Sequence, residues 1–495
     1  MMVRLFCSGC WYFLLISNLG YTNSKRDDIH HDVDPFALVR HFAKNRHLHE
    51  LSCFEKITGG DDYSFRYDPA FNILWDCFTD AVTKPWWTRF WCVQESILSP
   101  SATVVLGHWR VPWKTVKNCE INYKYHVSKC CALSCGSMPV DYTFYADLTI
   151  VSTHVDSHGN TSLIPCLSDD LDRLLRSFRY KTCQNPRDKV YGILGLVDTA
   201  VYGDLTVNYS LDIRTVYLSI MEAMLHQVSR LGDLRCLTGL GFNSAHHDLP
   251  SWVRDFEICP DLSSLHYEMM RYSLYDLYHA AGDSTAKIII LDKRFMLVRG
   301  CVVDKIEGVG EAVTSRDWSH ICVILENWAE LAGIDLSKDL HDGHIFESRQ
   351  ILFWRTLLGD IVSDDGEEAQ RITREDLRSF KTWVLTMQNA IRTQVLPPTD
   401  RYLKSLVVAT FGRVMFRTKH GYVGLCFPNC RLDDEIWVLQ GGKVPFLLRL
   451  CGQGYQSSTG NSSQYIFLGE GYMHSFMDGE AMQGSGSCIK EVVLR

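Results

Sequence analysis

The chain has 495 residues, of which 46% are hydrophobic and 22% are charged. This length exceeds the usual size of a single hydrophobic core, so two or three domains are expected. The formal net charge of −8, without any basic run, argues against a nucleic-acid-binding protein. The 19 cysteines are odd in number and scattered, which favours thiols in a reducing cytosol over a disulfide framework.

Residues 1–30 are predicted to be an extension unrelated to the rest of the chain. Arg4 is followed by an apolar run to Leu19, which is too short and too interrupted to span a membrane. The run is only weakly similar to a signal peptide, because small residues are poorly placed for cleavage. We therefore expect a cytoplasmic protein without a membrane span.

Two helices and a buried strand are predicted after the extension. Asp68 and Pro69 suit the start of the first helix, and apolar residues recur there at helical spacing. A second helix is expected to begin at Pro85 and to end before Pro100, apolar around most of its surface. The run Ala102–Leu106 is typical of a buried strand, and a helix followed by such a strand is typical of α/β domains.

Three polar residues, Arg89, Gln94 and Glu95, interrupt the second helix and are the first candidates for a site. Trp91 lies one turn before Glu95, so we expect it to cover this carboxyl group, and burial would raise the pKa of Glu95. A simpler interpretation is that Glu95 and Arg89 form ion pairs with other segments and so stabilise a buried helix.

Residues 117–165 show no sustained periodicity and are predicted to be a long loop. Four cysteines and a histidine cluster in this loop: Cys119, His126, Cys130, Cys131 and Cys135. Their spacing matches no paired zinc pattern, so we predict no metal site. No cofactor is evident either, and cofactor-binding residues stay unknown. Phosphate-binding glycine loops, nucleophile elbows and H-E-x-x-H motifs do not occur in the sequence.

The segment from residue 185 onward has the features of a strongly specified helix start. Asn185 is suited to accept from the first backbone N–H groups, Pro186 presets the first turn, and Asp188 places a negative charge at the positive helix end. For these residues and Arg187, we expect a structural role at the helix start rather than a role in a functional site.

The remaining chain is predicted to alternate between helical and strand-rich parts. A strand hairpin is expected at residues 287–306, and short strand-like runs separated by glycines continue from about 414 to 468. These strands predict a small barrel or rolled sheet, with residues 311–405 as a helical insertion. The predicted fold class is therefore α/β in the first part and mixed α+β overall.

Five motifs keep a characteristic order along the chain: RFWCVQE at 89–95, VLGHW at 105–109, NPRDKVYGILGL at 185–196, LPSWV at 249–253 and GEGYMHSFMDGEA at 469–481. In these motifs the chain resembles the fungal heterokaryon incompatibility (HET) domain family, in its subfamily with a C-terminal barrel. The resemblance implies four parts. They are the extension 1–30, a partial TIR-like or flavodoxin-like HET domain at 31–200, a helical connector at 201–285 and the barrel domain at 286–495.

Members of this family normally open with motifs of the type A-L-S-Y-x-W-G and W-I-D-x-x-C-I-N-Q, and neither occurs in this sequence. We expect either that the gene model starts too late or that the protein is a truncated member.

The resemblance implies a role in non-self recognition between fused hyphae that leads to programmed cell death. The expected partners are proteins, either an incompatibility partner or a second copy of the chain. Some TIR domains cleave NAD with a glutamate, so an enzyme with Glu95 as catalytic acid and NAD as substrate is an alternative. An inert truncated relative is the third interpretation. We prefer a protein without enzymatic activity.

Overall fold

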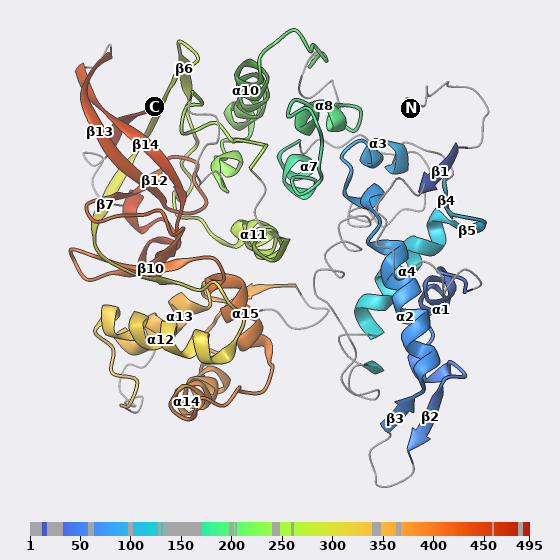
Figure 1. Ribbon diagram of the computed structural model, residues 1–495. Helices are drawn as coiled ribbons and strands as arrows, with labels where there is room; N and C mark the ends of the chain where they lie inside the picture. Colours follow the sequence, from blue (N-terminus) through green and yellow to red (C-terminus); the bar gives the residue numbers. More distant parts are fainter. Residues whose placement is uncertain are drawn as a thin grey trace. The chain divides into compact units, whose positions relative to one another are not determined.

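The computed structural model describes residues 12–16, 33–57, 64–97, 102–126, 130–131, 171–197, 202, 205–239, 248–258, 262–338, 348–362, 368–457, 460–483 and 489–495. The chain forms two compact units, coloured from blue to red along the sequence in Figure 1. Unit 1 comprises residues 1–198 and 261–263, and unit 2 comprises residues 199–260 and 264–495. The four-part domain division implied by the resemblance stays a prediction, because compactness alone does not mark the ends of a family domain.

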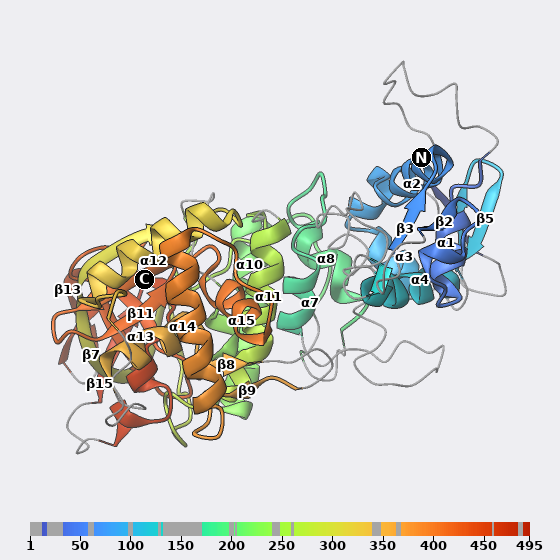
Figure 2. The same cartoon turned by 90° about the horizontal axis from the view of Figure 1, so that it is seen from below.

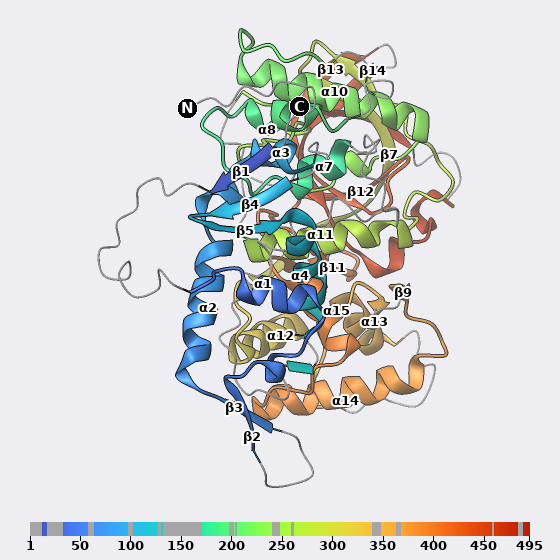
Figure 3. The ribbon, with the colours of Figure 1, turned by 90° about the vertical axis from the view of Figure 1, so that its right-hand side faces the viewer.

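Unit 1 contains a three-stranded sheet in which β4 (Ala102–Leu106) is the central strand. β1 (Tyr12–Ile16) pairs with β4 in parallel, and β5 (Trp109–Pro112) pairs with it antiparallel (Figure 3). The predicted strand at 102–106 is confirmed, with Val104 and Val105 buried. The TIR-like or flavodoxin-like character of residues 31–200 stays a prediction.

Three helices enclose the main core of unit 1: α1 (Ala37–Ala43), α2 (Pro69–Val82) and α4 (Trp113–Tyr125). Phe42, Phe78 and Tyr123 come from these three helices. Their rings meet at centroid distances of 5.2 to 6.3 Å, which suits tilted and edge-on aromatic contacts. A short 3-10 helix η1 (Leu48–Glu50) and a hairpin of β2 (Phe54–Ile57) and β3 (Ser64–Tyr67) complete this part.

The start of α2 follows the sequence prediction, whereas the predicted loop at 117–165 is wrong at its beginning. The Asp68 carboxylate accepts from the backbone N–H of Ala70 at 2.7 Å, as expected of an N-cap. Residues 117–125 belong to α4, because Val116, Cys119 and Tyr123 recur at helical spacing and are buried. Residues 132–165 lie outside the described part of the chain.

Unit 2 contains a closed five-stranded barrel, which confirms the predicted C-terminal barrel. Its longest strand, β7 (Phe295–Ala312), pairs with β12 (Glu435–Leu439) on one side and with β15 (Lys490–Leu494) on the other. β13 (Phe446–Ser457) pairs with β12, and β14 (Gly460–Glu470) pairs with β13. The parallel pairing of β14 with β15 closes the ring.

The other strands of this sheet extend from β7. β6 (Ile289–Leu291) forms the predicted hairpin with β7, whose turn holds Asp292 and Lys293 at φ of 52° and 51°. β10 (Val414–Thr418) pairs with β7, and β11 (Val423–Cys426) pairs with β10.

The helices of unit 2 lie in the two regions where the sequence predicts them. α10 (Ile213–Leu231) and α11 (Leu262–Leu274) precede the barrel strands. Between β7 and β10 the chain forms α12 (Trp318–Ala332), α13 (Arg349–Leu357), the small hairpin of β8 (Ile361–Val362) and β9 (Gln370–Arg371), α14 (Leu377–Thr393) and α15 (Arg401–Thr410). Figure 2 shows α12, α13 and α14 gathered on one side of the barrel strands.

A buried tryptophan helps to hold α12 against the barrel strand β7. The buried indole of Trp328 donates to the carbonyl of Glu311 in β7 at 2.8 Å. A Cβ atom at Gly310 would lie 2.5 Å from this indole, so glycine permits the close approach of helix and strand.

No helix among the described residues is long and apolar enough to cross a membrane.

Candidate functional site

The motif at 89–95 does not form the single helix predicted from Pro85 to Pro100. A 3-10 turn, η2 (Pro85–Thr88), and a short helix, α3 (Cys92–Ile97), are separated by Arg89, Phe90 and Trp91. Arg89 is extended, with φ of −74° and ψ of 134°, and forms a bridge with Thr182. The Phe90 N–H donates to the Thr182 carbonyl at 2.9 Å. The prediction of one helix is wrong because this distant segment satisfies the backbone where the helix breaks.

The motif at 185–196 begins with a turn, so Asn185 is not the predicted helix N-cap. α8 (Asp188–Leu194) starts three residues later. The Asn185 side-chain oxygen accepts from the backbone and the guanidinium of Arg187 at 3.2 and 3.3 Å, and its carbonyl accepts from the Asp188 N–H at 2.9 Å. Pro186 lies within this turn. Asp188 does occupy the first helical turn, where a negative charge complements the helix dipole.

The two motifs meet inside unit 1 and form what we call the motif junction, made of Phe90, Trp91, Asp188, Lys189 and Gly192. The Trp91 indole donates to Asp188 Oδ2 at 3.1 Å. A Cβ atom at Gly192 would lie 2.5 Å from the Phe90 ring, so these elements approach at a distance that only glycine permits. The Lys189 ammonium lies 5.8 Å from the Phe90 ring centroid. Residues almost a hundred positions apart are thereby packed together.

Two buried lysines fix the backbone around the motif junction. The Lys181 ammonium donates to the carbonyl of Trp87, just before Arg89. The Lys189 ammonium donates to the carbonyl of Arg179 at 2.7 Å and to that of Lys181. Buried cations persist only where such acceptors surround them, so these contacts hold the segments before α3 and α8 in place.

The predicted catalytic residue Glu95 lies on α3, and its side chain and that of Gln94 are half-buried, while Arg89 is exposed. Trp91, which was expected to cover Glu95, is itself 37% exposed and directs its indole N–H to Asp188. Burial raises the pKa of the neighbouring Cys92 thiol to about 12, and the Glu95 carboxylate adds to this rise. Cys92 is therefore no thiolate nucleophile at neutral pH. A catalytic role for Glu95 stays a prediction.

The motif at 249–253 anchors the end of the barrel in unit 2. The Ser251 N–H donates to the Arg495 carbonyl at 2.8 Å, and its hydroxyl accepts from the Phe467 N–H at 2.9 Å. The fully buried Trp252 donates to the carbonyl of Arg294 at 3.2 Å. This motif thus connects the strand ends at β7, β14 and β15.

The motif at 469–481 joins a buried ionic network that the sequence did not predict. Asp360 is 1% exposed, and its two oxygens pair with Arg355 at 2.6 Å and Arg371 at 2.8 Å. Arg371 also forms a bidentate pair with Asp478 of the motif, at 3.0 and 3.1 Å. The network connects the helical insertion to the last part of the barrel domain.

His474 of the same motif lies beside this network. Its Nδ1 is hydrogen-bonded to the Tyr472 hydroxyl at 2.9 Å. Burial lowers the pKa of His474 to about 3, and the positive charges of Arg355 and Arg371 contribute to the shift. His474 is therefore a neutral imidazole throughout the physiological pH range.

A further cluster in unit 1 consists of histidine and cysteine side chains, and the sequence pattern indicated only some of its members. His126, Cys130 and Cys131 were noted, but His47 was not, because it lies 84 positions before Cys131. Cys119 is buried in α4, and Cys135 lies outside the described residues. The signal available in the sequence was the histidine-rich segment between residues 41 and 49.

Known proteins resemble both the barrel and most of the chain. Residues 381–486 match the family model of the Het-6 beta-barrel domain, which takes in most of α14, all of α15 and β10 to β14. The chain is 20% identical over 490 residues to "Heterokaryon incompatibility protein 6, OR allele" of Neurospora crassa, covering 86% of this chain and 69% of that protein. No solved structure matches the chain.

Proposed function

We propose that this chain, a HET-family protein with a C-terminal Het-6 β-barrel, acts in fungal non-self recognition and leads to programmed cell death. One observation carries the proposal: similarity to the Neurospora protein extends over 86% of the chain and therefore beyond the barrel into unit 1. The partner is a protein, either an incompatibility partner or a second copy of this chain.

The geometry around the motif junction is that of a structural element of unit 1. Its buried cations are held by backbone carbonyls, and the adjacent Cys92 thiol is kept protonated by burial. Such groups maintain a fold and offer no activated nucleophile. The half-buried Glu95 is compatible with this interpretation as well as with the NAD-cleaving alternative.

The test is induced expression of the full chain in a panel of filamentous fungal strains of different incompatibility genotypes, with viable colonies counted. We expect death in at least one genotype. Survival in all of them, with the soluble protein present, would contradict the proposal and favour an inert relative.

Two glycine variants show whether killing depends on the barrel. A Cβ atom at Gly300 in β7 would lie 2.5 Å from the Val438 carbonyl, so Gly300→Ala distorts the barrel. Gly452 in β13 has no heavy atom within 4 Å of such a Cβ, so Gly452→Ala is the matched control. We expect Gly452→Ala to kill and Gly300→Ala to be inactive. Equal killing by both variants would show that the effector does not need an intact barrel.

A further inference from the structure

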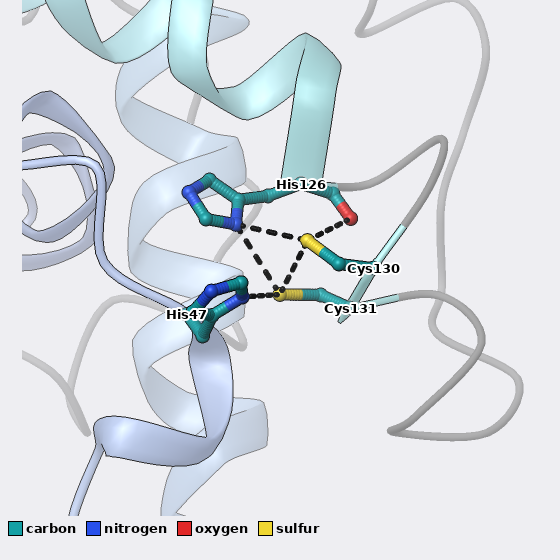
Figure 4. Close-up of side chains that lie close together, drawn as sticks. All are labelled: His47, His126, Cys130 and Cys131. Atoms are coloured by element: carbon teal, nitrogen blue, oxygen red, sulfur yellow. Dashed lines mark hydrogen bonds between the residues drawn. The ribbon is translucent and has the colours of Figure 1, made fainter.

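Four side chains from distant parts of unit 1 converge on one point: His47, His126, Cys130 and Cys131 (Figure 4). Their nearest nitrogen and sulfur atoms all lie within 4.8 Å of one another. His47 follows α1, His126 directly follows the last residue of α4, and the two cysteines come just beyond it. His126 and Cys131 are buried, and His47 and Cys130 are half-buried.

Four of the six distances between the ligand atoms of this His–Cys cluster lie within about 0.4 Å of those in a tetrahedral zinc site, and the other two are no longer than 4.8 Å. Zn–N bonds of about 2.0–2.1 Å and Zn–S bonds of about 2.3 Å place a nitrogen and a sulfur ligand about 3.6 Å apart, and two sulfurs about 3.8 Å apart. His126 Nδ1 lies 3.2 Å from Cys130 Sγ and 3.6 Å from Cys131 Sγ. His47 Nδ1 lies 3.8 Å from Cys131 Sγ, and the two sulfurs are 4.0 Å apart.

Neighbouring groups orient the ligands as they do around bound zinc. His126 Nε2 is hydrogen-bonded to the Asn45 side-chain oxygen at 3.0 Å, which leaves Nδ1 directed at the thiols. Asn45 holds this position with φ of 55°, a conformation that asparagine tolerates better than most residues. The Leu48 N–H donates to Cys131 Sγ at 3.4 Å and helps to fix the position of this sulfur.

The backbone of His47 is held from both sides. Its carbonyl is hydrogen-bonded to His41 Nε2 at 2.8 Å, and its N–H donates to Glu50 Oε1 at 2.8 Å. The imidazole of His47 also stacks on that of His49 at 5.0 Å. These contacts fix the ligand that comes from the most distant part of the sequence.

The donor set excludes a disulfide and a calcium or magnesium site. The 4.0 Å between the cysteine sulfurs is about twice the disulfide bond length of about 2.05 Å, so Cys130 and Cys131 are thiols. Calcium and magnesium require oxygen ligands, which this cluster does not supply. Two imidazoles and two thiols suit zinc, which binds four nitrogen and sulfur ligands.

We propose that His47, His126, Cys130 and Cys131 bind one Zn²⁺ ion and that this ion joins the segment after α1 to the end of α4. Four protein ligands complete the tetrahedral shell, so the site is structural and leaves no position for a substrate. Two thiolates neutralise the charge of the ion in a partly buried place. The proposal departs from the sequence prediction of no metal site, and it does not depend on the proposed function.

The first test is elemental analysis of the full chain purified without chelator. We expect about one zinc per chain and no other transition metal in comparable amount. Cys130→Ser and His126→Gln should lower the zinc content roughly tenfold or more, because each removes a ligand. Matched controls are His108→Gln, an exposed histidine of unit 1, and Cys183→Ser, a half-buried cysteine of unit 1, neither of which belongs to the cluster. Both controls should keep their zinc.

A variant that should weaken zinc binding without abolishing it tests the hydrogen bond between Asn45 and His126. Asn45→Ala removes the acceptor of His126 Nε2 and should weaken zinc affinity about 10- to 100-fold in competition with a chromogenic chelator. This partial loss distinguishes a bound ion from a thiol–imidazole cluster that carries none.

If the ligand variants fail to fold, cobalt substitution of the wild-type chain tests the proposal instead. After zinc is removed, Co²⁺ should bind at about one per chain and give thiolate-to-cobalt charge-transfer absorption together with tetrahedral d–d bands. A purified chain without zinc that shows no such spectrum with Co²⁺ would overturn the proposal. The proposal would also be overturned if the purified chain contained copper in place of zinc, or if the two control variants lost as much zinc as the ligand variants.

Discussion

His474 predicts a specific loss of stability in mild acid. In the folded protein its pKa is lowered to about 3, first by burial and then by the charges of Arg355 and Arg371. In the unfolded chain the imidazole takes up a proton near its ordinary pKa of about 6.5. The unfolded state therefore binds one proton more than the folded state between these two values. Stability is full above pH 6.5 and is lost as the pH falls towards 3.

The size of this loss of stability follows from the difference between the pKa values of His474 in the folded and the unfolded chain. Each pH unit below about 6.5 costs about 1.4 kcal/mol, so lowering the pH from 7 to 5 removes about 2 kcal/mol through this one group. His474→Gln cannot take up the proton. We expect the variant to lose about 2 kcal/mol less than the wild type over the same pH interval.

The measurement is denaturant-induced unfolding of wild type and His474→Gln at pH 7 and pH 5, followed by tryptophan fluorescence. His279→Gln is the control, because this side chain of the same unit is exposed, and its pH dependence should equal that of the wild type. Identical losses in wild type and His474→Gln would refute the argument, since they would show that His474 is protonated in the folded protein.

Four further outcomes are expected. Gly192→Ala should destabilise the protein by about 1–3 kcal/mol, because the new Cβ would lie 2.5 Å from the Phe90 ring. Alanine normally stabilises a helix relative to glycine, so a variant that is more stable in thermal unfolding would contradict the packing of the motif junction. Asp360→Asn should cost about 3–5 kcal/mol in denaturant titrations, because it leaves two guanidinium groups without their buried partner. Asp478→Asn should cost less than about 1 kcal/mol at this 54% exposed side chain, and equal costs would argue against the network as described. Purified protein should leave NAD unchanged by chromatography; consumption that Glu95→Gln abolishes would instead establish the NAD-cleaving alternative.

The barrel was the most predictable part of the structure because its signals are local. β10 and β12 lie within the region from about 414 to 468 where the sequence predicts short strands, since each is a short apolar run bounded by turn residues. The hairpin before β7 was recognisable from the turn at Asp292 and Lys293. β15 was not predicted, although its pairing with β7 and β14 closes the ring.

The departures from prediction arise where distant segments decide the local structure. No local pattern at Arg89 reveals that Thr182 will pair with the backbone there and interrupt a helix that the apolar spacing favours. Asn185 has the chemistry of a helix cap, but its side chain accepts from Arg187 in a preceding turn. His47 lies far in sequence from the residues that it faces, so spacing rules for metal ligands do not include it.

The closure of the barrel also sets an order of events during protein synthesis. β7 leaves the ribosome well before β15, which is one of its two neighbours in the ring. At about 5–20 residues per second, the roughly 180 residues between the ends of these strands take about 10 to 40 s to translate. During that interval one edge of β7 exposes unpaired backbone groups to chaperones and to other nascent chains. A message truncated anywhere before β15 would yield a protein whose sheet stays open at this edge and is prone to aggregation.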